Sequence, residues 1–177
     1  MADPGASGYR NFAQFYSVAA VAERAYNPRV DQLDIKAPPL RRLYGDWDQR
    51  RGGREFPARA DFDPVDLKYI LGDLTLVDVL HDPLRFRFRL HASNLADRGG
   101  IDMTGRLLDE MPDARRRNNA LRHYMKVLDT RRPSVIFLRN EYTDQRSWHC
   151  EVMVLPLAAD GTTIDMLMAA FAWENAE

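Results

Sequence analysis

Three strand-like runs follow one another in the final quarter of the sequence, and this feature most restricts the fold. The runs cover Ser134–Thr143, Trp148–Leu157 and Thr163–Trp173, with short polar turns at Asp144–Arg146 and Ala159–Gly161 between them. Runs joined by so short a turn pair as antiparallel hairpins, because a parallel connection needs a crossover of about a dozen residues or more. The carboxyl-terminal part is therefore predicted to be an antiparallel three-stranded sheet.

Two further strands come earlier, and helices separate the two groups. Leu74–Leu80 is rich in β-forming residues, His81–Leu84 reads as a turn, and Arg85–Ala92 alternates strictly between apolar and charged residues. Asn94–Met111 is expected to hold two short helices, and Asp113 to cap a longer helix that ends near residue 130. The order of two strands, a helical crossover and three strands predicts an α+β domain.

The segment before these elements divides into an extension and a lead-in. Residues 1–39 are predicted to be a helical extension with a linker, and residues 40–177 the main domain, with its core elements at about 73–174. Apolar residues at helical spacing predict an amphipathic helix over Asn11–Tyr26. A second helix should include Leu40 and Trp47 and end at Gly52, and a third should start at Pro64 with Asp63 as its cap.

Several short motifs occur in a fixed order from the lead-in to the crossover. They are Leu40-x-x-Leu43-x-x-x-Trp47, Arg51-Gly52-Gly53, Pro57-x-Arg59-x-Asp61-x-Asp63-Pro64, Leu76-Val77-Asp78-Val79, Phe86-Arg87-Phe88-Arg89-Leu90 and Asp102-x-Thr104-Gly105-Arg106-x-Leu108-x-Glu110. With them the chain resembles a family of short stand-alone bacterial PAS-like domains that is common in alphaproteobacteria. The resemblance covers roughly residues 40–173. It implies a PAS fold, a five-stranded antiparallel sheet with a helical crossover on one face. The N-terminal helical extension lies before the region of resemblance and is predicted from its own residues.

The chain departs from this family in one place. After Leu90 the family commonly has a Gly-Thr pair, whereas this sequence has His91-Ala92-Ser93-Asn94. If the family's glycine allows the backbone to approach a ligand, Ala92 is expected to narrow that end of a cavity.

No catalytic or metal-binding pattern is found in the sequence. It has no nucleophile elbow, phosphate-binding loop or zinc-protease motif, and its one cysteine, Cys150, excludes an intrachain disulfide and a thiolate zinc site. His149 is adjacent to Cys150 on a strand, so the two side chains should point to opposite faces. The aspartates Asp61, Asp63 and Asp66 lack the glycine and glutamate of a calcium loop. We predict no enzyme, no metal and a cytoplasmic location.

Haem and flavin are both disfavoured as cofactors. Some PAS sensors bind haem iron through a histidine on the long helix, but His123 is predicted to face solvent, away from the apolar stripe of that helix. His91 is predicted to point with the arginines of its strand. Cysteinyl-flavin photochemistry needs a cysteine on the crossover, whereas Cys150 lies on a strand.

An apolar pocket for a small ligand is one interpretation of the inward-facing residues, and ordinary core packing is the other. The pocket would combine the inner stripe of the long helix with inward strand residues. Its predicted members are Phe86, Phe88, Leu121, Tyr124, Met125, Leu128, Phe137 and Trp148.

The outer sheet face offers a predicted interface. The last strand is apolar on both faces, so a further element must cover the sheet from outside, either the N-terminal helix or a second subunit. An arginine row on the second strand could pair with Asp165 or Glu151, or be solvated. The predicted interface residues are Phe12, Phe15, Tyr16, Arg85, Arg87, Arg89, Phe171 and Trp173.

Charge and hydropathy exclude two classes of partner. The net charge is −1, and the basic run Arg115–Arg117 has no interleaved aromatic residues, so nucleic-acid binding is not expected. No run reaches the roughly 20 apolar residues of a membrane helix. We therefore hypothesise a non-catalytic sensory module that acts through protein–protein interaction as a homodimer and is modulated by a small ligand. The alternatives are a dedicated small-molecule sensor and a small enzyme on an α+β scaffold.

Overall fold

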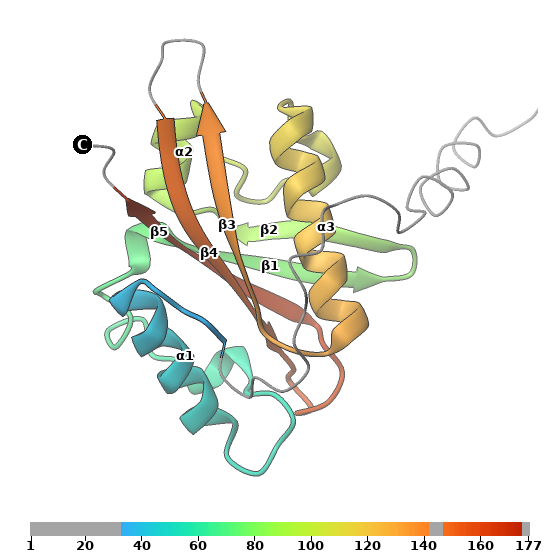
Figure 1. Ribbon diagram of the computed structural model, residues 1–177. Helices are drawn as coiled ribbons and strands as arrows, with labels where there is room; N and C mark the ends of the chain where they lie inside the picture. Colours follow the sequence, from blue (N-terminus) through green and yellow to red (C-terminus); the bar gives the residue numbers. More distant parts are fainter. Residues whose placement is uncertain (1–32, 142–146, 175–177) are drawn as a thin grey trace, which may run out of the picture. The chain divides into compact units, whose positions relative to one another are not determined.

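The fold is seen in a computed structural model that describes residues 33–141 and 147–174, with the side chains of 139–141 and 147–148 excepted (Figure 1). The expected helix at Asn11–Tyr26, with Phe12, Phe15 and Tyr16, lies outside the described residues, as does the turn at Asp144–Arg146. The helices are α1 (Pro38–Arg51), α2 (Ser93–Gly99) and α3 (Ala114–Thr130). Short 3₁₀ turns lie at η1 (Arg59–Asp61), η2 (Leu71–Asp73) and η3 (Leu108–Glu110).

One antiparallel sheet of five strands organises these helices. Its strands are β1 (Leu74–His81), β2 (Leu84–Leu90), β3 (Ser134–Glu141), β4 (Ser147–Leu157) and β5 (Met166–Glu174), in the order β2-β1-β5-β4-β3. β5 pairs with β1, so the last strand joins the amino-terminal hairpin to the carboxyl-terminal one. The predicted fold class, a five-stranded antiparallel PAS-type sheet with a helical crossover, is confirmed.

The register assigns the strand residues to two faces. On the inner face, Val77 lies opposite both Phe88 and Leu167, and all three are buried. On the outer face, Asp78 lies opposite Arg87 and Met166. Because successive strand residues alternate between faces, the whole sheet divides in this way. The first five residues of β5 are buried, so this part of the strand is covered on both sides, as the sequence predicted.

α1 begins over the outer face. Glu151, which points outward from β4, accepts hydrogen bonds from the backbone N–H groups of Lys36 (2.8 Å) and Ala37 (2.6 Å), just ahead of the helix. Further along, the Trp47 indole donates to the carbonyl of Pro156 (2.8 Å), and Leu40 is fully buried. Within the described residues, the outer apolar surface of β4 and β5 is therefore covered by the lead-in helix.

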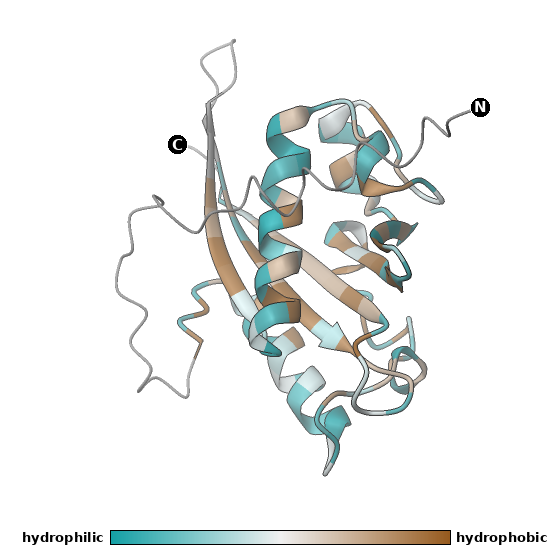
Figure 2. Cartoon of the chain, turned by 90° about the vertical axis from the view of Figure 1, so that its right-hand side faces the viewer, coloured by the Kyte–Doolittle hydropathy of each residue, from teal (hydrophilic) through white to brown (hydrophobic). Residues whose placement is uncertain are grey.

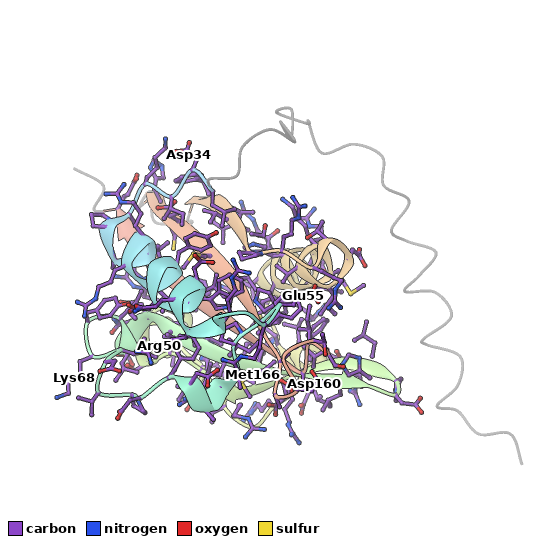
Figure 3. The ribbon with its side chains drawn as sticks, turned by 90° about the horizontal axis from the view of Figure 1, so that it is seen from below. Asp34, Arg50, Glu55, Lys68, Asp160 and Met166 are labelled. Atoms are coloured by element: carbon purple, nitrogen blue, oxygen red, sulfur yellow. The ribbon has the colours of Figure 1, made fainter. Side chains whose placement is uncertain are left out.

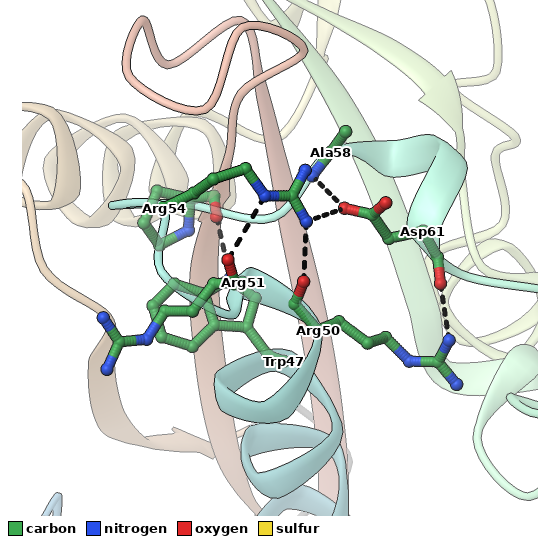
Figure 4. A network of polar contacts seen from close by, with 7 residues as sticks. Trp47, Arg50, Arg51, Arg54, Ala58 and Asp61 are labelled. Carbon is green, nitrogen blue, oxygen red and sulfur yellow. Dashed lines mark hydrogen bonds and ion pairs between the residues drawn. The ribbon is translucent and has the colours of Figure 1, made fainter.

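Arginines fix the loop that follows α1 (Figure 4). The Arg54 guanidinium donates to the Arg50 carbonyl and to Asp61, both at 2.7 Å. The same Asp61 carboxylate accepts from the Ala58 N–H at 2.7 Å. Glu55, labelled in Figure 3, pairs with Arg131 at the end of α3 (2.8 Å). These contacts anchor the loop to the end of α1 and to α3.

The helix expected after Asp63 does not form. The Asp63 carboxylate accepts from the Val65 N–H, two residues on, at 2.8 Å, and residues 64–70 form consecutive turns. Such a local side-chain bond competes with helix formation. The turns place Leu67 and Ile70 in the core. Among the described residues no group of three carboxylate, histidine or cysteine side chains could hold a metal ion, and no helix is long and apolar enough to cross a membrane.

Candidate functional site

A cavity of about 570 Å³ lies between α2, α3 and the inner face of the sheet. Its sheet wall is mainly apolar, with residues from β3, β4 and β5. Its helical wall is mixed, and Figure 2 shows that hydrophilic and hydrophobic residues succeed one another along α3. The residues that line it include Thr75, Phe88, His91, Arg98, Asp113, Arg116, Asn119, Ala120, His123, Tyr124, Ile136, Leu138, Cys150, Val152, Ala169, Phe171 and Trp173.

The face of α3 that lines the cavity differs from the predicted stripe. The buried residues of α3 are His123, Tyr124 and Val127, so the prediction that His123 faces solvent is wrong. Leu121 and Met125, like Leu128, are only partly buried and do not line the cavity. The periodicity of α3 predicts that its most apolar face is the buried one. Here that face carries polar residues, which a cavity tolerates and a packed core does not.

His123 is a neutral imidazole in the cavity wall. Its Nε2 lies 3.2 Å from the carbonyl oxygen of Ser134, which only accepts, so Nε2 carries the proton. Burial lowers the pKa of His123 from 6.5 to about 4, and the neutral ring therefore leaves a lone pair on Nδ1. No described residue donates to that atom. Nearby, the buried Ser134 Oγ also has no partner among the described residues.

Tyr124 adds a second buried polar group. It is 4% exposed, and its ring packs at a tilt on Phe86 with centroids 5.3 Å apart. No described residue forms a hydrogen bond with its hydroxyl, and burial raises its pKa well above 10, so the hydroxyl stays protonated. Phe86 itself is buried but does not line the cavity, whereas Phe88 does.

His91 was predicted to point outward with the arginines, and this is also wrong. β2 ends at Leu90, so strand alternation no longer sets the direction of the next side chain. The His91 ring meets Phe88 edge-on at 5.4 Å and lines the cavity with a side chain 7% exposed. Burial and the nearby Arg116 charge lower its pKa, against Asp102, which raises it. Ala92 is buried outside the lining, so it does not narrow the cavity as expected.

The orientation predicted for Phe137 is wrong as well. Its side chain is 56% exposed on the outer face, and its neighbours Ile136 and Leu138 line the cavity instead. The run Val135–Leu138 is apolar at every position, so the sequence held no alternation from which to fix the phase. The side chain of Trp148 lies outside the described part of the chain.

Phe171 and Trp173, predicted as interface residues, line the inner cavity. Their rings are stacked, with centroids 6.2 Å apart and planes 13° from parallel. The Arg98 guanidinium of α2 lies 4.3 Å from the centre of the Trp173 ring. The two stacked rings thus form an aromatic part of the cavity wall, with a guanidinium over one of them.

The three arginines of β2 lie on the outer face of the sheet, as predicted, but their acidic partners differ from the predicted ones. Arg87 and Arg89 both bind the buried Asp78 carboxylate, at 2.9 and 2.7 Å, and Arg85 binds Asp109 at 2.6 Å. Of the expected partners, Glu151 is occupied by the backbone before α1, and Asp165 accepts from the Ala159 N–H at 2.9 Å. The row is therefore held mainly within its own hairpin.

Cys150 lines the cavity from β4 and is 2% exposed. Burial raises the pKa of its thiol to about 12. His149 lies on the opposite face, 39% exposed, with Nδ1 3.8 Å from the Glu174 carboxylate. As predicted, the two neighbours do not form a nucleophile–base pair.

Comparisons with known proteins agree with this architecture. Residues 35–171 match the sequence profile described as a PAS domain. No curated protein matches the chain.

Solved structures with a similar fold include light-oxygen-voltage proteins. The Rhodobacter sphaeroides protein has 15% identity and a TM-score of 0.42, covering 63% of this chain and 68% of its own. A variant of the fungal photoreceptor VVD has 15% identity and a TM-score of 0.43, covering 80% and 99%. A light-oxygen-voltage domain studied with a flavin analogue has 13% identity and a TM-score of 0.41, covering 58% and 77%. At these scores the likeness says nothing about the ligand.

Proposed function

We propose that this chain, which belongs to the PAS domain family, is a sensory module that binds a small organic molecule in the cavity between α2, α3 and the sheet. The cavity volume of about 570 Å³ carries the proposal. Protein interiors contain few voids larger than a water molecule, whereas ligand pockets usually span about 300–1,000 Å³. The alternative interpretation of the inward residues, ordinary core packing, does not account for so large a space.

The polar groups of the wall support binding over a simple packing defect. The Nδ1 of His123 and the hydroxyl of Tyr124 have no hydrogen-bond partner among the described residues, and both side chains line the cavity. A ligand that donates to His123 and pairs with the Tyr124 hydroxyl would use these groups, so they are suited to selecting a molecule.

The predictions made against haem and cysteinyl-flavin restrict the identity of the ligand only in part. The sequence-based objection to haem assumed an exposed His123, and that premise no longer holds, although its Nε2 is engaged with Ser134. A cysteinyl-flavin adduct would have to form at Cys150, on β4 rather than on the crossover, with a thiol held protonated. We propose a ligand bound without a covalent bond to the chain.

The signal is proposed to leave by association rather than by catalysis. A ligand that binds one arrangement of the helices better than another shifts the population of surfaces that a partner can distinguish. Homodimerisation through the N-terminal helix with Phe12, Phe15 and Tyr16 remains a prediction, as do an unidentified protein partner and a bacterial, cytoplasmic setting. Phe137, 56% exposed on the edge strand β3, supports an interface at that side.

Native mass spectrometry of the chain purified from its own cells tests the proposal. We expect one small molecule per chain in the wild type and none in Ala120→Phe, which places a phenyl ring in the cavity wall. Ala114→Phe makes the same substitution at an exposed position on α3 and should keep the ligand. A bare mass for the wild type, or equal occupancy in both variants, would refute ligand binding in this cavity.

A further inference from the structure

The face of α3 that lines the cavity carries several polar residues over its first three turns. Arg116, Asn119 and His123 all line the cavity, at relative positions 0, 3 and 7, which fall on one side of a helix. A helix face that packs against a core is normally apolar. The composition of this face is therefore evidence about the molecule that lies against it, and the inference below rests on the proposed function.

Two guanidinium groups lie at one end of the cavity. The Arg116 side chain reaches from α3 to α2, where a Cβ added to Gly99 would lie 2.5 Å from its Nη1. Arg98 comes from the last turn of α2 and lies over the Trp173 ring. Both arginines line the cavity.

The acidic residue in this part of the wall is already engaged. Asp113 caps α3 by accepting from the Arg116 N–H at 3.0 Å, and its other oxygen lies 3.4 Å from the Arg116 guanidinium. Asp113 is the one carboxylate among the described lining residues, against two guanidinium groups. Both lining histidines have lowered pKa values and are neutral near pH 7. The described lining residues at this end therefore offer a ligand more guanidinium donors than carboxylate acceptors.

The other end is suited to hydrogen bonding and to apolar contact. Arg116 and His123 are seven residues apart, which at 1.5 Å per residue separates their backbones by about 10 Å along α3. Between them the cavity faces the apolar side chains Ile136 and Val152. The stacked Phe171 and Trp173 rings form an aromatic part of its wall.

We propose that the ligand is an organic anion with an apolar body about 10 Å long. Its acidic head, a carboxylate or a phosphate, pairs with Arg98 and Arg116. Its body lies against the apolar sheet wall, and its far end donates a hydrogen bond to His123 Nδ1. Guanidinium groups suit both kinds of head, because their planar donors match the oxygens of either.

A pair of fluorescent probes distinguishes the contribution of the charge to binding affinity from that of the apolar body. Anilinonaphthalene sulfonate is an aromatic anion, and phenylnaphthylamine has the same ring system without the sulfonate. Fluorescence titration of the full chain, freed of any co-purified molecule, should give at least tenfold tighter binding of the sulfonate. Displacement by naphthylacetate and by naphthyl phosphate then shows which head the site prefers, and displacement by either supports an anion site.

Substitution of each arginine tests whether that residue binds the sulfonate group. Arg116→Gln and Arg98→Gln should each weaken binding of the sulfonate about tenfold, the loss expected for one charge-assisted contact of about 1.4 kcal/mol. Both should leave binding of phenylnaphthylamine unchanged, which shows that the cavity is intact. Arg115→Gln is the matched control, because Arg115 is the exposed neighbour outside the lining and should alter neither probe.

The outcomes distinguish the two proposals. If neither probe binds the wild type, or if Ala120→Phe binds both unchanged, the cavity is not a ligand site and the proposed function fails. If both probes bind the cavity with equal affinity, or if Arg115→Gln weakens the sulfonate as much as Arg116→Gln does, the ligand-binding function stands and the anionic class is wrong.

Discussion

Burial of His123 in a neutral form should make the stability of the fold depend on pH. The pKa of His123 falls from 6.5 to about 4 because burial disfavours the charged ring. The native state therefore binds fewer protons than the unfolded state between these two values. Above pH 6.5 the ring is neutral in both states, so His123 does not alter the free energy of unfolding there. As the pH falls from 6.5 toward 4, the unfolded state takes up the proton first and the fold loses stability.

The size of the effect follows from the same values. The difference between 6.5 and about 4 corresponds to a limit of about 3 kcal/mol, at about 1.4 kcal/mol per pKa unit. At pH 4.5 about 2 kcal/mol of this should already be lost. His123→Gln keeps an N–H that can donate to the Ser134 carbonyl but cannot take up a proton in this range, so this part of the pH dependence should disappear.

Urea unfolding of the wild type and of His123→Gln at pH 7 and at pH 4.5 measures the difference. The wild type should lose about 2 kcal/mol more than the variant over this interval, since protonation of carboxylates affects both proteins alike. Parallel losses in the two proteins would refute the assignment of His123 as a buried neutral group. An NMR titration that finds His123 protonated near pH 6.5 would do the same.

Two other contacts give direct tests. Glu151→Gln should lower the free energy of unfolding by about 2 kcal/mol, because an amide NH₂ would face one of the N–H groups of Lys36 and Ala37 that the buried carboxylate now accepts. Glu55→Gln, at an exposed pair with Arg131, should change the urea midpoint much less, and equal effects would contradict the role given to Glu151. For Cys150, a pKa of about 12 leaves on the order of one thiol in 10⁴ ionised at pH 8, so a disulfide reagent should label the native chain at least about a hundredfold more slowly than the unfolded chain. Similar labelling rates would show that this thiol is accessible.

Much of the fold could be predicted from local patterns. The alternation in Arg85–Leu90 and the short turns between the last three strands specify antiparallel hairpins, and β2 and the β4–β5 hairpin form as expected. Asp113 caps α3 as predicted, with its carboxylate accepting the Arg116 N–H. In each case a few neighbouring residues determine the structure.

The candidate site could not be predicted in the same way, because its residues depart from the rule that apolar side chains face inward. His123 and Arg116 line a cavity from a helix face that the pattern assigned to solvent. Phe137 is exposed because a run of four apolar residues leaves the phase of β3 undetermined. The inward direction of His91 depends on the end of β2, which the sequence placed two residues later.

A crystal structure of the chain purified from its own cells would show whether the space between α3 and the sheet belongs to a ligand. We expect continuous density for one small molecule that contacts the Arg116 guanidinium at one end and the His123 ring at the other. Side chains such as Leu138 and Trp173 closing over the space, with no room left for a ligand, would contradict it.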